Sequence, residues 1–241
     1  MGGLTSDFAG VFEDFIFAVR ILVMAAIAEQ ETIHELTFGG LPLPLTVRPP
    51  VAMSDEELLR FSRQNRTYRI ERNARGELEI MSPSGGDGSR WESRVIRELD
   101  FWAEENGGAS FSSNGGFHLP DGSVLSADAA FVSGVRWHSL NKADRRRFPP
   151  LCPDFVIEIL SASDSRPVLE AKMQAWMDNG AQLAWMIDPY RATLSIYRPG
   201  LAVEVLERPD WVEAGEPVSG FRLSPRLLWD DDKNNRGQED A

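Results

Sequence analysis

The segment from Pro153 to Leu160 holds the residues best suited to chemistry. It is apolar except for Asp154 and Glu158. Side chains alternate between the two faces of a strand, so both acids share one face, and apolar residues occupy both faces. This pattern predicts a central strand covered on both sides. A glutamate buried there needs a cation or a metal ion beside it, and a structural salt bridge explains Glu158 equally well when it is taken alone.

A second short apolar segment, Ser126 to Val132, carries one acid, Asp128, near its start. Carboxylates on neighbouring strands form an oxygen-rich site suited to Mg²⁺, which takes few protein ligands and keeps several waters. Such an ion lowers the pKa of a bound water and polarises a phosphoryl oxygen. Taken alone, Asp128 is better explained as a strand-start or turn residue.

Lys172 lies in the helix predicted to follow the Glu158 strand. Leu169, Met173 and Trp176 mark the buried stripe of that helix, and Lys172 sits at its edge. From there it can extend toward the sheet. A lone lysine at such a position is usually a surface residue. Lys172 therefore indicates a catalytic site only together with the two acids. Trp176 is interpreted as a core residue.

Asp128, Glu158 and Lys172 together resemble the catalytic set of the PD-(D/E)XK nuclease superfamily. More closely, residues 54–228 resemble the Uma-two family of restriction endonuclease-like proteins. The resemblance rests on several collinear stretches, among them GGFHLPDGSVLSADAAFV, FPPLCPDFVIEILSASD and EAKMQAWMDNGAQLAWMIDP. Collinear stretches of this length are more specific than any single motif.

The chain departs from the pattern of these relatives at two positions. Ala127 stands where a proline usually precedes the first acid, which alters the backbone and not the ligand. Leu160 stands where the superfamily usually has its lysine. In this family the lysine is found on the following helix, which corresponds to Lys172. The resemblance therefore implies a complete catalytic set.

The resemblance implies an α/β fold with a restriction-endonuclease-like core, a mixed β-sheet flanked by helices. It also implies hydrolysis of DNA phosphodiesters. Asp128 and Glu158 would hold Mg²⁺ or Mn²⁺, with the backbone carbonyl of Ile159 as a further ligand. Lys172 would orient the attacking water and stabilise charge on the phosphate.

Two further acids have other candidate roles. Glu92, on the first long predicted helix, is a candidate catalytic acid that would reach the metal through water, but Ser89 and Glu92 also fit a capping box. Asp154 lies at the start of its strand, which suits a structural role or indirect support of the metal ligands.

Helices and strands interleave along the chain, which predicts one α/β domain with a mixed sheet. Ser54 and Glu57 form a capping box before the first helix. Two longer helices are predicted over residues 89–105 and from Pro167 to about 179. Strands are predicted over residues 67–72, 77–81, 109–112, 116–119, 127–132, 154–160, 183–187, 193–197 and 203–206.

The predicted domain covers residues 51–229. Residues 1–50 are interpreted as a loosely ordered extension and linker, and residues 230–241 as a disordered acidic tail. The apolar stretch 8–28 is interrupted by Glu13, Asp14 and Arg20, which argues against a membrane span. The early charges are acidic, which argues against a signal peptide.

Composition narrows the class of protein further. The 241 residues contain one cysteine, Cys152, so no intramolecular disulfide can form, which fits the cytoplasm. The net charge of −12 argues against a protein that coats DNA. A few phosphate contacts remain compatible with it, and the basic residues between Arg136 and Arg147 could supply them. A solvated loop is an equally good interpretation of that cluster.

The leading hypothesis is a Mg²⁺-dependent DNA endonuclease. One rival is a catalytically silent binding or regulatory module on the same fold, which the acidic charge favours. A second rival, a two-carboxylate glycosidase, is supported only by the acids. The target site, the choice between DNA and RNA, and the oligomeric state stay open, with a homodimer as one alternative.

The N-terminal assignment leads to a first prediction. Met24 could be the natural start. Residues 1–40 should pack loosely or not at all, because they precede the family-like region. We expect a chain that starts at Met24 to have the same melting temperature as the full chain, as measured by calorimetry. A large drop in melting temperature would show that residues 1–23 stabilise the domain.

Overall fold

A computed structural model describes residues 43–162 and 164–229. The chain divides into two compact units, Met1–Pro83 and Ser84–Ala241, and each is described by itself. The predictions for residues 1–40, for the apolar stretch 8–28 and for the tail 230–241 fall outside the described residues. Within residues 43–162 and 164–229, no helix is long and apolar enough to cross a membrane.

The first unit contains the helix α2 (Asp55–Gln64), which begins with the predicted capping box. The Ser54 hydroxyl accepts from the Glu57 backbone N–H at 3.3 Å, and the Ser54 backbone N–H donates to the Glu57 carboxylate at 2.7 Å. These two bonds satisfy backbone donors that a helix start otherwise leaves open. The helix buries Leu58 and Phe61.

Three strands complete the first unit. β2 (Arg69–Arg72) and β3 (Leu78–Met81), both predicted as strands, pair antiparallel. Gly76 adopts a positive φ of 76° in their turn, a conformation that favours glycine. β1 (Leu45–Val47) pairs with β3 inside the stretch interpreted as a linker. Its three residues are too few to show strand periodicity, so its pairing alone defines it.

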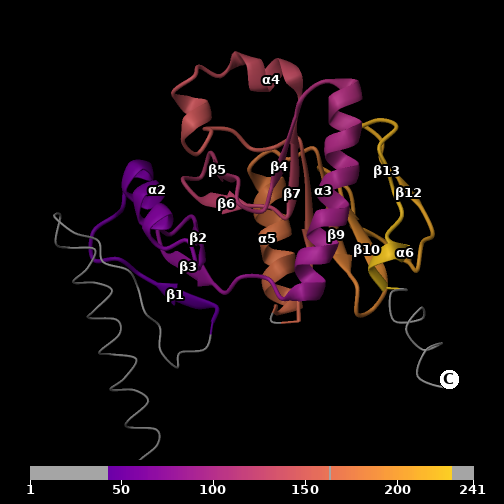
Figure 1. The fold of residues 1–241 in the computed structure, drawn as a ribbon, viewed down its shortest axis with the longest axis horizontal. Helices are drawn as coiled ribbons and strands as arrows, with labels where there is room; N and C mark the ends of the chain where they lie inside the picture. Colours follow the sequence, from indigo (N-terminus) through magenta and orange to yellow (C-terminus); the bar gives the residue numbers. More distant parts are fainter. Residues whose placement is uncertain (1–42, 163, 230–241) are drawn as a thin grey trace, which may run out of the picture. The chain divides into compact units, whose positions relative to one another are not determined.

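The second unit is built on a six-stranded sheet (Figure 1). Its order is β11 (Glu204–Glu207), β10 (Thr193–Tyr197), β9 (Leu183–Asp188), β8 (Phe155–Ile159), β7 (Ala129–Val132) and β4 (Ala109–Ser112). β8 and β9 are parallel, and the other pairs are antiparallel. This confirms the mixed sheet and the α/β class, and it confirms β8 as an internal strand.

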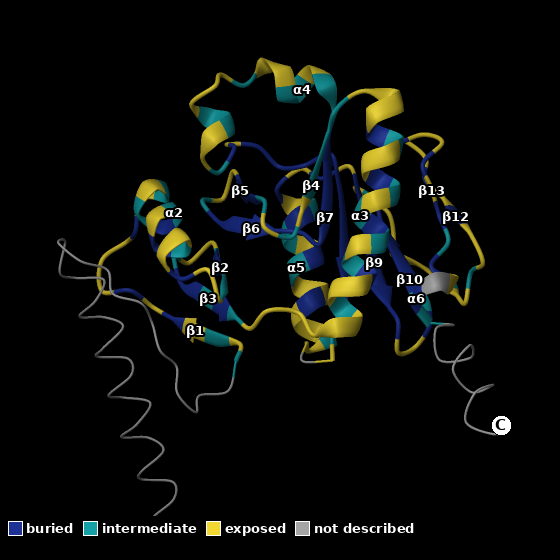
Figure 2. Ribbon diagram, in the orientation of Figure 1, coloured by how far each residue is buried: buried dark blue, intermediate teal, exposed yellow. Residues whose placement is uncertain are grey.

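A helix covers each face of this sheet. α3 (Gly86–Asn106) buries Trp91, Val95 and Leu99 in one core, together with the odd-numbered residues of β8. α5 (Arg166–Asp178) buries its residues in a second core, on the face of Val156 and Leu160. Figure 2 shows the strands mostly buried, while both helices expose their outer sides. Glu158, which has the parity of Val156, therefore faces α5.

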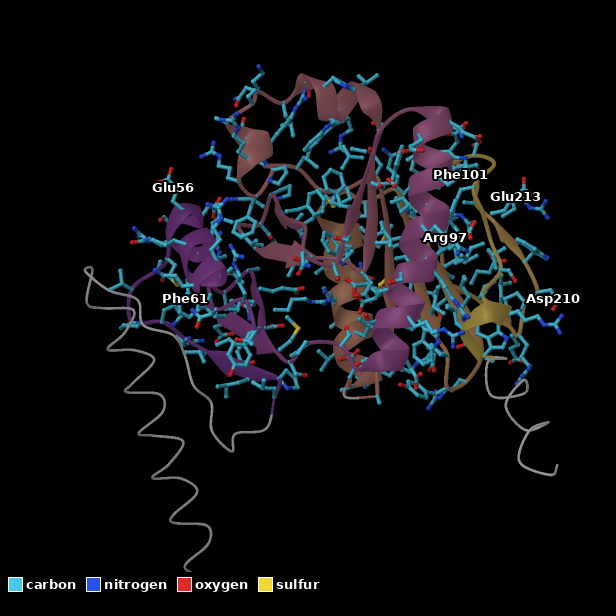
Figure 3. All side chains as sticks on the ribbon, in the orientation of Figure 1. Glu56, Phe61, Arg97, Phe101, Asp210 and Glu213 are labelled. Carbon is cyan, nitrogen blue, oxygen red and sulfur yellow. The ribbon has the colours of Figure 1, made fainter. Side chains whose placement is uncertain are left out.

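α3 begins three residues earlier than the sequence predicts. Its N-cap is Gly85, which has no side chain for capping, and the Ser89 N–H donates to the Gly85 carbonyl at 2.9 Å. Ser89 therefore lies inside the first turn, and the predicted capping box of Ser89 and Glu92 is wrong. The outer face of α3 carries Arg97 and Phe101, both exposed (Figure 3).

Several short elements of the second unit were not predicted. They are the helix α4 (Gly134–Ser139) and a 3₁₀ turn (Asp144–Arg146) within the predicted basic loop, the strand β6 (Val124–Ser126), the pair β12 (Val212–Glu213) and β13 (Arg222–Leu223), and the helix α6 (Arg226–Trp229). β6 pairs with β5 (Gly116–His118). Of these two strands, β5 was predicted. Two-residue strands and helices of a single turn are too short to show strand or helix periodicity.

Glu77 in the first unit gives a prediction about pH. Hydrogen bonds from Asn73 and Arg75, and one from Arg48, lower the pKa of its carboxyl to about 2. Because the folded pKa lies below the unfolded one, the stabilisation is complete above pH 4.5 and is lost as the pH falls toward 2. We expect wild type to be more stable than Glu77→Gln at pH 7, with a difference that shrinks across this window in urea denaturation. A difference that stays constant from pH 7 to pH 2 would contradict this assignment.

Candidate active site

Glu158 is a buried carboxylate in the internal strand β8, with 1% of its surface exposed. Its Oε1 atom accepts a hydrogen bond from the Trp176 indole N–H at 2.9 Å. The same oxygen lies 3.0 Å from the Lys172 ammonium. Burial of a carboxylate is tolerable only with such partners, and both come from α5.

Lys172 extends toward the sheet and does not lie along the protein surface. Its ammonium donates to the Ser126 carbonyl at 2.7 Å, and its side chain is 14% exposed. Ser126 ends β6, two residues before Asp128. Lys172 thus contacts both segments that carry the predicted metal-binding acids.

Asp128 lies between β6 and β7 and is 6% exposed. Its Oδ2 atom accepts from the backbone N–H of Ile159 at 2.7 Å. The backbone pairing between β7 and β8 ends with Ala129 opposite Ile157. The Ile159 N–H lies beyond this pairing, and the Asp128 side chain accepts its hydrogen bond in place of a strand carbonyl. This bond fixes the Asp128 carboxylate beside the residue that follows Glu158.

These contacts bring Glu158 and Lys172 together on the α5 face of the sheet and fix Asp128 beside the strand that carries Glu158. The donor set suits Mg²⁺, which needs only one or two protein carboxylates. No cluster of three or more His, Cys, Asp or Glu side chains suited to a metal occurs within residues 43–162 and 164–229. A closed zinc site is therefore absent from that part of the chain.

Cys152 is unsuited to nucleophilic catalysis. Burial raises the pKa of its thiol to about 12, and its Sγ atom donates to the Trp176 carbonyl at 3.6 Å. Only a thiolate is strongly nucleophilic, and this thiol stays protonated at neutral pH.

Asp154 is held by structural contacts. It is 1% exposed, and it accepts from the Ser133 backbone N–H at 2.7 Å, from Arg136 at 2.5 Å and from the Gln182 amide at 3.0 Å. These donors attach the start of α4 to the sheet. They support the structural interpretation of Asp154.

Glu92 lies on α3, which covers the opposite face of the sheet from Lys172. Its two carboxylate oxygens accept from the Ser84 hydroxyl at 2.5 Å and from the Ser113 hydroxyl at 3.0 Å. The structure thus pairs Lys172 with Glu158 and bonds Asp128 to the residue after Glu158, whereas the two hydrogen bonds to Glu92 come from serines outside this set.

Asp188, at the end of β9, is a buried acid that the sequence analysis missed. It accepts from the Arg166 guanidinium at 2.8 Å and from the Tyr190 and Arg191 backbone N–H groups at 3.0 and 2.9 Å. The sequence could have indicated Asp188 as a buried acid, because it follows an apolar run, Leu183 to Ile187, that resembles the apolar residues around Glu158.

The basic residues between Arg136 and Arg147 are partly engaged within the protein. Arg136 binds Asp154, and Arg147 binds Asp144 at 2.5 Å. The Arg145 guanidinium lies 5.2 Å from the centre of the Trp137 ring. These contacts reduce the charge that this cluster offers to a phosphate.

Comparison with known protein families decides the identity. Residues 55–226 match the Uma2 family, described as "Putative restriction endonuclease". The chain belongs to this family. The match includes Asp128, Glu158 and Lys172. None of the curated proteins matches the chain.

Among solved structures, one that is similar to this member of the Uma2 family is a crystal structure of a "putative nuclease belonging to DUF820" from Anabaena variabilis ATCC 29413. The two share 22% sequence identity with a TM-score of 0.60, over 73% of this chain and 97% of the other. At that identity, the similarity establishes the fold.

The contact between Glu158 and Lys172 gives a prediction about stability. Removing one partner of a buried ion pair costs about 3 kcal/mol, or roughly 6–12 °C in melting temperature for a domain of this size. We expect Glu158→Gln and Lys172→Met each to lower the melting temperature in this range. The double variant should lose less than the sum of the two, because the first change already removes their mutual attraction.

A surface pair provides the control for this cycle. Arg198 and Glu204 lie 3.1 Å apart with side chains 36% and 53% exposed. Exposed pairs contribute about 0–1 kcal/mol, so Glu204→Gln should barely change the melting temperature. Strict additivity of the Glu158 and Lys172 changes would show that the two groups do not interact in solution.

Proposed function

We propose that this protein is a Mg²⁺-dependent endonuclease that hydrolyses phosphodiester bonds in DNA. The observation that carries the proposal is the convergence of Glu158 and Lys172, with Asp128 bonded to the residue after Glu158. Membership of the Uma2 family supports the same chemistry. Fold alone would not, because one fold can host many activities.

Asp128 and Glu158 would hold the ion, with the Ile159 carbonyl as a third oxygen donor. Two carboxylates are enough for an ion that keeps most of its own waters. Mn²⁺ has the same preference for oxygen ligands and could replace Mg²⁺. When bound, the ion lowers the pKa of a water and offsets charge on the phosphate.

Lys172 would act on the water and on the phosphate, not as a ligand. It is a flexible, strongly hydrated point charge. An anionic substrate near the site offers its ammonium a second negative partner besides Glu158. From α5, Lys172 can then stabilise charge that grows on the phosphate during attack, which is typically worth 10²–10³-fold in rate.

Glu92 enters the proposal only as an acid that acts through water. Hydrogen bonds from Ser84 and Ser113 hold the Glu92 carboxylate away from direct contact with the ion. Backbone contacts with DNA would come from the residues between Arg136 and Arg147. Arg136 contributes least to them, because Asp154 already binds it.

A second candidate function is a catalytically silent module on the same fold. The observation that favours it is the ion pair itself, because Lys172 already balances the charge of Glu158 without a metal ion. The net charge of −12 also disfavours tight binding to DNA. Metal titration separates the two functions, since only the nuclease must bind a divalent ion.

Cleavage of supercoiled plasmid DNA with and without Mg²⁺ tests the proposal. We expect nicking by wild type that requires Mg²⁺, and no nicking by Glu158→Ala or Asp128→Asn, because each loses a ligand. Lys172→Ala should keep Mg²⁺ binding in calorimetry and lose about 10²–10³-fold in rate. Glu92→Gln should lose less than either ligand variant.

Glu204→Gln is the matched control, because it removes an exposed carboxylate of the same unit. It should cleave like wild type. Cleavage by Lys172→Ala at the wild-type rate would remove the lysine from the mechanism. A wild-type protein that binds no divalent ion would favour the silent module.

A further inference from the structure

Trp176 contacts the same oxygen of Glu158 as Lys172 does. The indole N–H lies 2.9 Å from Glu158 Oε1, and the Trp176 side chain is fully buried in the core under α5. An indole can only donate, and a buried N–H needs an acceptor. The acceptor of the Trp176 N–H is the carboxylate at the centre of the proposed site.

The spacing on α5 explains why two donors reach one atom. Lys172 and Trp176 are four residues apart, so they lie one helical turn apart on the same side of the helix. Their two side chains approach Glu158 from neighbouring turns. The charged donor is 14% exposed, and the neutral donor is fully enclosed.

We propose that Trp176 is a positioning residue that holds the Glu158 carboxylate in the orientation required for Mg²⁺ binding. The inference rests on the proposed nuclease function. Lys172 cannot hold Glu158 throughout a turnover, because its ammonium also has to act on water and phosphate. Trp176 stays in place during a turnover, because packing fixes its ring. Since the indole is neutral, its hydrogen bond does not cancel the carboxylate charge that attracts the ion.

A second buried tryptophan serves as a matched control. Trp185 on β9 is also fully buried, and it lies in the core on the opposite face, 5.1 Å from the Phe155 ring. Within the described part of the chain, no atom accepts a hydrogen bond from its indole N–H. Replacing either tryptophan by phenylalanine removes a similar volume, but only Trp176→Phe removes a bond to Glu158.

The test is calorimetric titration of Mg²⁺ into the full-length wild type, Trp176→Phe and Trp185→Phe. We expect Trp176→Phe to bind Mg²⁺ about 10–100-fold more weakly, which is typical when a partner of a metal ligand is lost. Trp185→Phe should bind like wild type, whatever its melting temperature. Equal affinities for wild type and Trp176→Phe, or equal losses in both variants, would overturn the positioning role.

Nuclear magnetic resonance of the ¹⁵N-labelled wild type tests the same role without a substitution. The Trp176 indole N–H resonance should shift during Mg²⁺ titration, whereas that of Trp185 should stay in place. A Trp176 resonance that does not respond to bound Mg²⁺ would overturn the inference, even if Trp176→Phe fails to fold. A wild type that binds no Mg²⁺ in calorimetry would instead overturn the proposed function, and with it this inference.

Discussion

The burial of the Glu158 carboxylate in the middle of a sheet is the constraint on which the second unit depends. An ionised carboxylate without partners is too costly to bury, so donors must reach it from a neighbouring layer. β8 and β9 are parallel, and a parallel pair needs a crossover connection. That crossover is α5, and it packs on the face to which Glu158 points. The topology therefore delivers Lys172 and Trp176 to the position where the carboxylate needs them.

Two other buried acids of this unit, Asp154 and Asp188, are held by a different kind of partner. Arginine and backbone or amide N–H groups bind Asp154 and Asp188. Arginine stays charged and forms fixed, multiple hydrogen bonds, whereas lysine is a single, flexible and strongly hydrated charge. Glu158 is the acid whose charged partner is a lysine. Asp154 and Asp188 thus have rigid partners, whereas Glu158 has one partner, Lys172, that would turn to a substrate in the proposed mechanism and another, Trp176, that stays fixed.

Family membership and local geometry support the proposed function in different ways. The Uma2 match covers residues 55–226 and concerns the chain as a whole. The local contacts concern the proposed chemistry, because Lys172 meets Glu158 directly and Asp128 is bonded to the residue that follows Glu158. The acidic net charge limits how strongly this protein can hold DNA, so a few local phosphate contacts near the site would have to position the substrate.

The sequence by itself determined the elements whose signals are local. The capping box at Ser54, the helix from about Pro167 and the buried strand around Glu158 follow from hydrogen-bonding groups and periodicity within a few residues. Alternation along β8 also determined which face Glu158 takes. The tertiary structure alone decided which partners contact Glu158. Alternation along a strand assigns a side chain to a face of the sheet, but it does not identify the residues that pack against that face. The tertiary structure confirmed Trp176 as a core residue and gave its indole N–H a bond to Glu158, joined Asp128 to the Ile159 N–H and placed the helix of Glu92 on the opposite face. These contacts depend on the order of strands and on the packing of helices over the sheet, to which residues far apart in the chain contribute.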